Sequence, residues 1–351
     1  MRFRVWIRLL AAFVILIGLE ADAAGAQKGG VSVVANAEAR RIDVAIDGEP
    51  FTSWVWPESL TKPVLFPIRT EQGTRVTRGF PLEPVAGERV DHPHHVGLWL
   101  SYGDVNGVDF WNNSSALGAA EQAKMGRHVQ TRVLAAEGGR TTGRVSVAIE
   151  WRMPDGSVAL DEEASITFGK VARGRFIERS GVLVARDKPV ALGDNKEGLL
   201  GLRVARWLEQ PTKEPLVLTD SAGRPTSVPT LDNTGVTGLY HTSEGKQGDE
   251  IWATRGRWAA LSGRTGDEDV TIAILDDPKN PGAPTYWHAR GYGLFAANPL
   301  GQKVFSNGRE TLDLVLAPGQ KVRFRWRVLI LSSVFDAKRL DEEWQSFAES
   351  R

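Results

Sequence analysis

The chain has 351 residues, and its 43 basic residues are balanced by 43 acidic ones, so its formal net charge is zero. General nucleic-acid binding requires a marked excess of Lys and Arg, so this balance excludes it. The sequence contains no cysteine, which excludes disulfide scaffolds, iron–sulfur clusters, thiolate zinc sites and a cysteine nucleophile. Any chemistry must therefore use imidazole, carboxylate, amide, hydroxyl or guanidinium groups.

The N-terminus has the order of a secretory signal. Three arginines precede an apolar run over residues 9–19, and two small-residue cleavage sites follow within residues 21–26. The run is shorter than the ~20 residues that a membrane helix needs. The sequence therefore predicts a signal peptide over residues 1–26, export to the periplasm or the medium, and no membrane span in the mature chain. An uncleaved anchor is the alternative.

Most of the remaining chain alternates between apolar and polar residues and is interrupted by turn dipeptides at short intervals. This period of two predicts antiparallel strands that are joined by hairpins. The clearest examples are residues 31–35, 41–46, 143–151, 269–275 and 321–330. Because the spacing continues without a linker or a repeat, residues 27–351 are predicted to form one all-β domain, a large antiparallel β-sandwich.

The last predicted strand places Arg323, Arg325 and Arg327 on one face and apolar residues on the other. The arginine face is expected to be solvated rather than to bind an anion. After Asp336, a candidate N-cap, large apolar residues recur at helical spacing and predict a short C-terminal helix that covers the sheet. A weaker helical pattern, interrupted by glycines, covers residues 114–127.

Histidines are concentrated in one short motif. Three of the six lie within the sequence Asp91-His-Pro-His-His95. In an extended strand His92 and His94 would project from the same face, and Pro93 would suit a strand end. Two imidazoles on one face can bind Zn²⁺ or a similar divalent ion, or act as general acid and base. The alternative is a buried polar network in which the imidazoles only form hydrogen bonds.

Three other segments combine polar and aromatic side chains. Residues 97–112 contain tryptophans, carboxylates and amides, residues 193–198 contain a lysine and two carboxylates between glycines, and residues 280–299 contain a histidine among aromatic residues. An indole can stack against the C–H face of a sugar ring while planar polar groups bind its hydroxyls. The simpler explanations are Asx turns, a charged β-turn and an aromatic sandwich core.

The sequence resembles the bacterial family labelled methane oxygenase PmoA, a domain of unknown function, in four motifs. These are Arg78-Gly-Phe-Pro81, Asp91-His-Pro-His-His95 through Trp111, Gly193-Asp-Asn-Lys-Glu-Gly198, and Thr285-Tyr-Trp-His288 through Pro299. The resemblance extends over about residues 30–348. It implies an exported β-sandwich similar to the galactose-mutarotase supersandwich, in a family found near sugar oxidoreductases and polysaccharide-degrading functions. Because the methane monooxygenase subunit of that name is a polytopic membrane protein, the label is interpreted as a misannotation.

The sequence departs from the family pattern at three positions. Val96 stands where an arginine is common, Asn195 replaces a threonine, and Gly291 replaces an acidic residue. Two charged side chains are therefore lost beside the expected site, which puts a ligand contact, and the activity itself, in question.

The leading hypothesis is an exported enzyme of hydrolase, lyase or epimerase type that acts on a sugar or sugar derivative in a His-rich cleft. The expected catalytic residues are His92, His94, His95, Glu197 and His288, with His92 and His94 also candidate ligands of a divalent metal. The expected substrate-binding residues are Arg78, Trp99, Asp104, Asn106, Asp109, Trp111, Lys196, Arg203, Trp287, Arg290 and Asn298. Among them Lys196 and Arg203 would hold an oxyanion or hydroxyls, and the tryptophans would form a stacking platform.

Two other hypotheses use the same residues. A non-catalytic carbohydrate-binding module would use the aromatic cleft without proton transfer, and a metal-linked oxidase would match the family label. In each case the expected ligand is a small molecule or an oligosaccharide, with no nucleic-acid partner. The sequence leaves the oligomeric state open.

Overall fold

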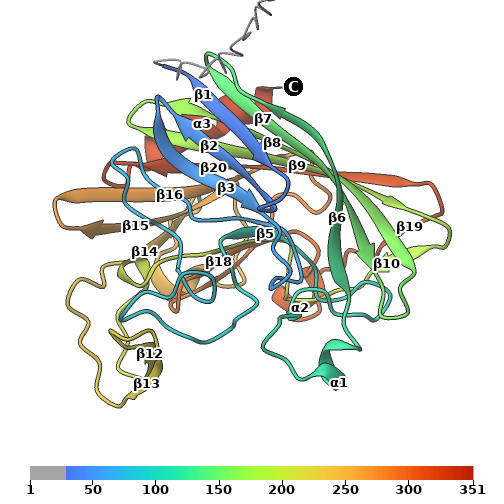
Figure 1. Cartoon of the computed structure of the whole chain (residues 1–351), viewed down its shortest axis with the longest axis horizontal. Coiled ribbons are helices and arrows are strands. Elements are labelled where there is room, and N and C mark those ends of the chain that lie inside the picture. The colour runs from blue at the N-terminus through green and yellow to red at the C-terminus, as the bar shows by residue number, and fades with distance from the viewer. Residues whose placement is uncertain (1–28, 351) are drawn as a thin grey trace, which may run out of the picture.

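The computed structural model describes residues 29–350 and places two eight-stranded antiparallel sheets face to face (Figure 1). The predicted signal peptide lies outside these residues. In spatial order the first sheet contains β1 (Val31–Asn36), β2 (Arg41–Ile46), β3 (Glu49–Val55), β4 (Val64–Leu65), β5 (Leu98–Leu100), β11 (Leu200–Arg203), β18 (Leu294–Asn298) and β17 (Tyr286–Arg290). The second contains β14 (Leu239–Thr242), β15 (Trp258–Thr265), β16 (Glu268–Asp276), β20 (Lys321–Leu331), β9 (Gly174–Ala185), β8 (Val158–Val171), β7 (Thr142–Arg152) and β6 (Arg127–Glu137).

The remaining elements are short and lie mainly in the loops. Two small sheets pair β10 (Val190–Leu192) with β19 (Leu314–Leu316) and β12 (Leu216–Thr219) with β13 (Pro225–Val228). The helical elements are α1 (Ala119–Gln122), α2 (Gln302–Phe305), α3 (Ala337–Glu349) and the 3₁₀ turns η1 (Arg206–Leu208) and η2 (Gly248–Ile251). Among residues 29–350, no helix has both the length and the apolar character that crossing a membrane requires. The predicted all-β sandwich and all five predicted strands are confirmed.

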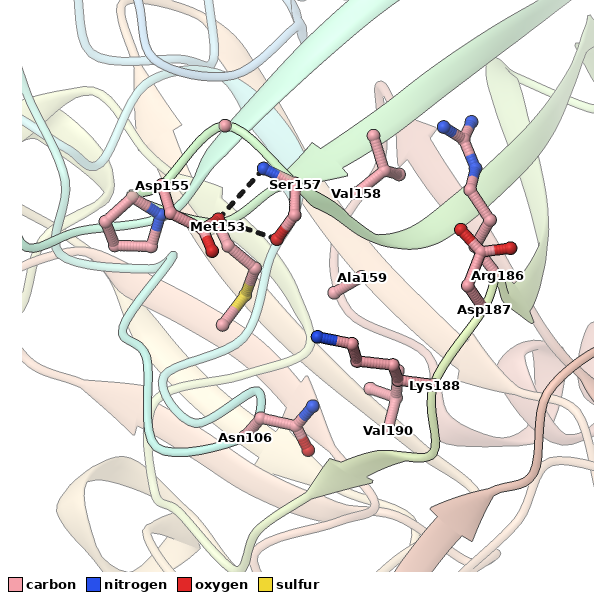
Figure 2. Close-up of a pocket in the computed structure, with 12 residues that line it drawn as sticks. Asn106, Met153, Asp155, Ser157, Val158, Ala159, Arg186, Asp187, Lys188 and Val190 are labelled. Carbon is pink, nitrogen blue, oxygen red and sulfur yellow. Dashed lines mark hydrogen bonds between the residues drawn. The ribbon is translucent and has the colours of Figure 1, made fainter.

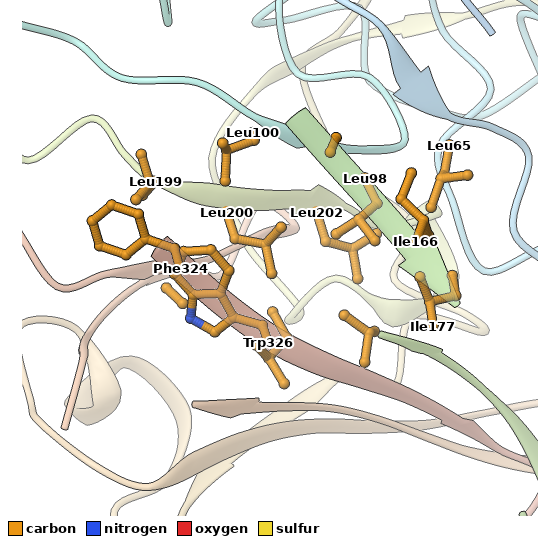
Figure 3. Close-up of a cluster of buried hydrophobic side chains, with 14 of the residues drawn as sticks. Leu65, Leu98, Leu100, Ile166, Ile177, Leu199, Leu200, Leu202, Phe324 and Trp326 are labelled. Carbon is orange, nitrogen blue, oxygen red and sulfur yellow. The ribbon is translucent and has the colours of Figure 1, made fainter. Parts of the chain in front are cut away.

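The space between the sheets is filled by one apolar core, and strand alternation decides which side chains enter it. On β5, Leu98 points into this core while its neighbour Trp99 points to the outer face of the first sheet. Figure 3 shows Leu202 of the first sheet near Ile177 and Trp326 of the second. Burying an aliphatic side chain of this size contributes roughly 2 kcal/mol. The outer face of the first sheet carries a smaller apolar cluster, which includes Trp99 and Trp111, together with polar groups and loops.

The predicted C-terminal helix is confirmed as α3. The side chain of Asp336 caps it by accepting a hydrogen bond from the backbone N of Arg339 at 3.2 Å. Leu340 and Phe347 pack against the outer face of the second sheet. Figure 1 shows α3 on the side of the sandwich away from α1 and the β12–β13 hairpin. The other predicted helix is reduced to the single turn α1, because glycines flank it.

The arginine face of β20 is not solvated, which corrects the sequence prediction. Arg325 is buried because α3 lies over it. Its guanidinium pairs with Glu178 at 2.8 Å and with Asp277 at 2.9 Å, and it also donates to backbone oxygens at the end of α3. Arg327 is partly buried and pairs with Glu178 at 2.8 Å. Only Arg323 stays exposed.

Candidate functional site

The outer face of the first sheet carries the polar residues that the sequence singled out. Cross-strand pairing aligns Trp99 of β5 with Gly201 of β11 and, across β18, with His288 of β17. The adjacent row aligns Arg203 of β11 with Arg290 of β17 across the same strand. Segments that lie about 200 positions apart in the chain therefore meet on one surface.

A cleft of about 640 Å³ opens on this face. Of the residues predicted to form the site, those that line it are His92, His94, His95, Lys196, Glu197, His288 and Arg290. The sequence prediction missed Asn112, Asp249, Trp252 and Tyr292, which also line it. Tyr292 lies within a segment that the sequence singled out, whereas nothing in the local pattern around Asp249 and Trp252 indicated a site.

The loop that carries the three early histidines is a turn rather than an extended strand. His92 has a left-handed φ of 43°, and the backbone N of His95 donates to the carbonyl oxygen of His92 at 2.9 Å. The expectation that His92 and His94 project from one strand face is therefore wrong. Both reach the cleft from the turn, with ring centroids 5.7 Å apart and ring planes at 76°.

Aromatic stacking fixes the ring of His92. Its centroid lies 4.9 Å from that of Tyr292 and 5.0 Å from that of His95, and the three ring planes are parallel within a few degrees. His95 stacks in turn on Trp99 at 5.3 Å. Stacking orients the imidazole of His92 without using its nitrogens, of which Nδ1 lies 3.4 Å from Asp91 Oδ2.

Two buried arginines hold the histidine loop from behind. Arg78 donates to Asp91 Oδ1 at 2.8 Å and to the carbonyl oxygens of His92 and His95 at 2.9 and 3.0 Å. Arg203 donates to the same Asp91 oxygen at 2.6 Å. Because Arg78 is 1% and Arg203 0% exposed, neither can bind a substrate directly, which corrects the sequence prediction. Their role is to position the loop.

The tryptophans of the predicted platform are buried. Trp99 and Trp111 are 1% and 0% exposed, because Gly201 leaves room for both indoles against β11. Trp287 is 0% exposed, since strand alternation on β17 points it into the core between the sheets. The indole that does line the cleft belongs to Trp252. The prediction of a three-tryptophan platform is therefore wrong.

Asp104, Asn106, Asp109 and Asn298 do not line the cleft either, because their side chains stabilise loops. The two aspartates each accept a hydrogen bond from the backbone N three residues further along, at 2.8 and 3.0 Å. Asn106 bonds to backbone groups at the start of β10, at 2.7 and 3.2 Å. Asn298 donates to two carbonyl oxygens of the 193–198 loop at 2.8 and 2.9 Å, so it positions that loop.

The three departures from the family pattern lie in different environments. Val96 is buried behind the histidine loop, and Gly291 lines the cleft. The side-chain oxygen of Asn195 accepts a hydrogen bond from the backbone N of Glu197 at 2.8 Å. A threonine hydroxyl could accept the same bond, so this replacement preserves the local turn.

A carboxyl and an imidazole lie side by side in the cleft. Glu197 Oε2 is 3.8 Å from His288 Nδ1, and Glu197 Oε1 is 3.4 Å from Lys196 Nζ. Burial raises the pKa of Glu197 above its ordinary value. Burial, together with the charge of Arg290, lowers the pKa of His288 to about 3. At neutral pH His288 is therefore uncharged, and Glu197 is more easily protonated than an exposed carboxyl.

Two further histidines of the cleft, the half-buried His94 and the buried His95, are also uncharged at neutral pH. Burial, assisted by nearby positive charge, lowers the pKa of His94 to about 2 and that of His95 well below its ordinary value. Trp111 Nε1 donates to His95 Nε2 at 3.3 Å, and Arg203 Nη1 lies 3.3 Å from His95 Nδ1. Both nitrogens of His95 therefore face protein groups, which makes it a positioning residue rather than a catalytic one.

The candidate ligands of a divalent metal are His92 and His94. Across residues 29–350 no group of three or more His, Asp or Glu side chains is placed to hold an ion. His92 Nδ1 faces Asp91 Oδ2 at 3.4 Å, and the ring nitrogens of His95 face protein donors.

A second hollow, of about 690 Å³, lies beside β10 at the end of the β7–β8 hairpin (Figure 2). Asp155 accepts hydrogen bonds from the backbone N and the hydroxyl of Ser157, at 2.9 and 2.6 Å, which closes the hairpin turn. Lys188 points into the hollow beside Met153. The hollow holds no imidazole and no buried carboxyl, so it lacks the acid–base groups of the cleft.

Comparisons with known proteins identify one family and several distant structures. The model of a family of unknown function, DUF6807, matches residues 41–345 and carries no methane oxygenase name. A search of curated proteins finds no match. The X-ray structure of a galactose mutarotase related enzyme from Lactobacillus acidophilus is 11% identical, with a TM-score of 0.33, over 87% of this chain and 99% of that chain. A galactose mutarotase-like protein from Clostridium acetobutylicum is 10% identical, with a TM-score of 0.29, over 86% and 98%. A polysaccharide lyase is 10% identical, with a TM-score of 0.30, over 84% of this chain and 34% of that chain.

Proposed function

The chain belongs to DUF6807, a family of unknown function, and from the residues of the cleft we propose an enzymatic role for it. In this proposal the protein is an exported enzyme that acts on a sugar or sugar derivative by acid–base catalysis. The observation that carries the proposal is the partly buried Glu197, with its raised pKa, beside a neutral His288 in a polar cleft. Perturbed carboxyl and imidazole groups that share a concavity are the usual sign of acid–base chemistry.

Each candidate residue has a distinct role in this proposal. Hydrolysis, elimination and epimerisation of a sugar each need one proton given and one taken. Glu197 in its protonated form gives a proton to a substrate oxygen. His92 takes the other proton, because Asp91 Oδ2 lies 3.4 Å from its Nδ1 and stabilises the imidazolium that results. The neutral imidazoles of His94 and His288 donate or accept hydrogen bonds without adding charge.

The burial of the tryptophans favours an enzyme over a binding module. A module that holds a sugar by stacking needs exposed indoles, but Trp99, Trp111 and Trp287 are at most 1% exposed. Only Trp252 and Tyr292 offer large aromatic rings to the cleft, amid charged and imidazole groups. Most of the lining is therefore suited to proton transfer and hydrogen bonding rather than to stacking.

Loss of either proton-transfer group should abolish turnover without abolishing binding. We expect Glu197→Gln and His92→Gln each to lower kcat by about 10²- to 10⁴-fold, while the substrate Kd changes little. The activity is sought by incubating the purified mature protein with oligosaccharides and their keto and acid derivatives and detecting products by mass spectrometry. The control is Glu214→Gln, which removes an exposed carboxyl outside the cleft.

Several outcomes would contradict the proposal. Unchanged kcat in both cleft variants would remove the assigned roles of Glu197 and His92. Tight binding of a sugar without turnover of any compound in the panel would favour the binding module instead. Export is a separate part of the proposal and rests on the pattern of residues 1–26 alone. It is checked by sequencing the N-terminus of the protein recovered from the periplasm.

A further inference from the structure

We infer that the natural ligand of the cleft carries an anionic substituent, a carboxylate or a sulfate ester, which Arg290 and Lys196 bind. The inference rests on the proposed function in that the ligand is taken to be a sugar derivative. It goes further because it selects an acidic or sulfated sugar over a neutral one.

Arg290 lines the cleft, and its guanidinium donates no hydrogen bond to any other residue of the described chain. It ends β17 on the face that also carries His288. Its guanidinium lies 4.8 Å above the indole of Trp252, and it forms no ion pair within residues 29–350. Stacking on the indole holds the guanidinium plane but leaves its N–H groups free. A fixed, unpaired guanidinium fork matches the geometry of a carboxylate or sulfate.

Lys196 supplies the second positive charge. Its side chain is 49% exposed, and its ion partner within the described chain is Glu197 at 3.4 Å. Burial raises the pKa of Glu197, so this partner carries its negative charge less readily than an ordinary carboxylate. Burial first, and then the charges of Arg290 and Lys196, lower the pKa of His288. Both cations therefore act on the same part of the cleft.

Asp249 also lines the cleft, and its carboxylate accepts a hydrogen bond from the side-chain amide of Gln210 at 2.7 Å. The amide leaves the charge of Asp249 in place but occupies one of its oxygens, and within residues 29–350 Asp249 forms no ion pair with Arg290 or Lys196. The neutral histidines contribute no charge, so the anion-binding capacity of the cleft comes from Arg290 and Lys196. A carboxylate or sulfate held there would lie close to Glu197, because Lys196 is adjacent in the chain and in contact with it.

The inference is tested by binding measurements that need no turnover. Isothermal titration calorimetry compares hexuronates, the matched neutral hexuronamides and hexose 6-sulfates. We expect the wild type to prefer the anionic sugars by about tenfold to hundredfold, and Arg290→Gln and Lys196→Gln each to remove most of this preference. The hexuronate and 6-sulfate arms show which anion is preferred. Arg290→Lys, which keeps the charge but loses the planar fork, should retain part of the preference.

The control is Arg140→Gln, which makes the same change in net charge at an exposed site outside the cleft and should leave the preference intact. Circular dichroism melting of each variant shows that the fold is preserved. Equal binding of hexuronate and hexuronamide by the wild type, no binding of either anion, or a preference that survives Arg290→Gln would each overturn the inference. Turnover of neutral sugars would then still support the proposed function, whereas anion binding without turnover of any sugar would support the inference alone.

Discussion

At the scale of single residues, one glycine decides where two indoles go. Gly201 lies on the outer face of β11, opposite Trp99. A Cβ at this position would approach Trp99 within 2.4 Å and Trp111 within 2.8 Å. The missing side chain therefore lets the indoles pack beneath His95 instead of facing the cleft. Nothing in the local sequence around either tryptophan shows this, because the space is provided by a strand 90 or more positions away.

Gly201→Ala should therefore destabilise the protein. Overpacking against the two indoles is expected to cost about 1–3 kcal/mol of unfolding free energy, measured by urea denaturation. Gly118→Ala is the matched control, because a Cβ there meets nothing within 4 Å and the backbone φ of −60° suits alanine. A Gly201→Ala protein as stable as the control would contradict the packing argument.

Strand alternation on β17 distinguishes a core residue from a cleft residue. Residues 286–290 form a strand, so Trp287 and His288 point to opposite faces. Once His288 is assigned to the cleft, Trp287 must face the core. By contrast, the participation of Asp249 and Trp252 depends on how a distant loop folds back. No local pattern predicts that.

At the scale of elements, the C-terminal helix changes the environment of a strand that the sequence describes correctly. The alternation of Arg325 and Trp326 on β20 is as predicted, but α3 covers the arginine face. The amphipathic pattern predicted that the helix would cover a sheet, yet it did not identify which strand face would lie beneath it. Buried ion pairs to Glu178 and Asp277 are the consequence.

The cap of α3 gives a test at this scale. Asp336→Ala removes the side-chain oxygen that accepts from the backbone N of Arg339, and should lower the unfolding free energy by about 1 kcal/mol. Asp336→Asn keeps an oxygen acceptor and should retain most of that stability. Urea denaturation of the three proteins distinguishes these outcomes. Equal stability of the alanine and wild-type proteins would show that the cap does not contribute.

At the scale of the whole molecule, buried neutral histidines should make the fold sensitive to acid. Burial lowers the pKa of His94 to about 2 and of His288 to about 3, and lowers those of His95 and His128 well below the ordinary value of 6.5. The unfolded chain therefore binds more protons than the folded one below about pH 6.5. Stability is full above this pH and is lost as the pH falls further.

Four carboxyls oppose the histidines, because burial raises the pKa values of Glu88, Glu197, Glu209 and Asp276. Burial raises the pKa of Asp276 to about 7, so its contribution to stability decreases as the pH rises through the interval between 3.8 and that value. Burial also lowers the pKa of His241, so five histidines act against these carboxyls, and we expect the unfolding free energy to fall between pH 6.5 and 4.5. His94→Gln removes one proton uptake and should reduce the slope by about 1.4 kcal/mol per pH unit. Denaturation curves at several pH values measure this slope, and an unchanged slope would contradict the assignment.

The sequence predicts the strands of this molecule better than their order. Period-two alternation located the long strands, because it reports local side-chain burial. It does not report that β5 pairs with β11 and β11 with β18, although these pairings bring the histidine loop to His288. Composition and the family resemblance predict that four histidines meet at one cleft. Only the folded chain shows how the surroundings of each imidazole differ.

The pairing of Arg78 and Arg203 with Asp91 constrains which substitutions this protein can accept. Arg78 and Arg203 share one oxygen of Asp91, so replacing the aspartate alone leaves two guanidinium groups in the interior without their common counter-charge. Replacing either arginine alone removes hydrogen bonds that hold the loop over residues 91–95. Lineages descended from this protein should therefore keep all three residues or exchange them jointly, and their histories of substitution at these positions should be correlated.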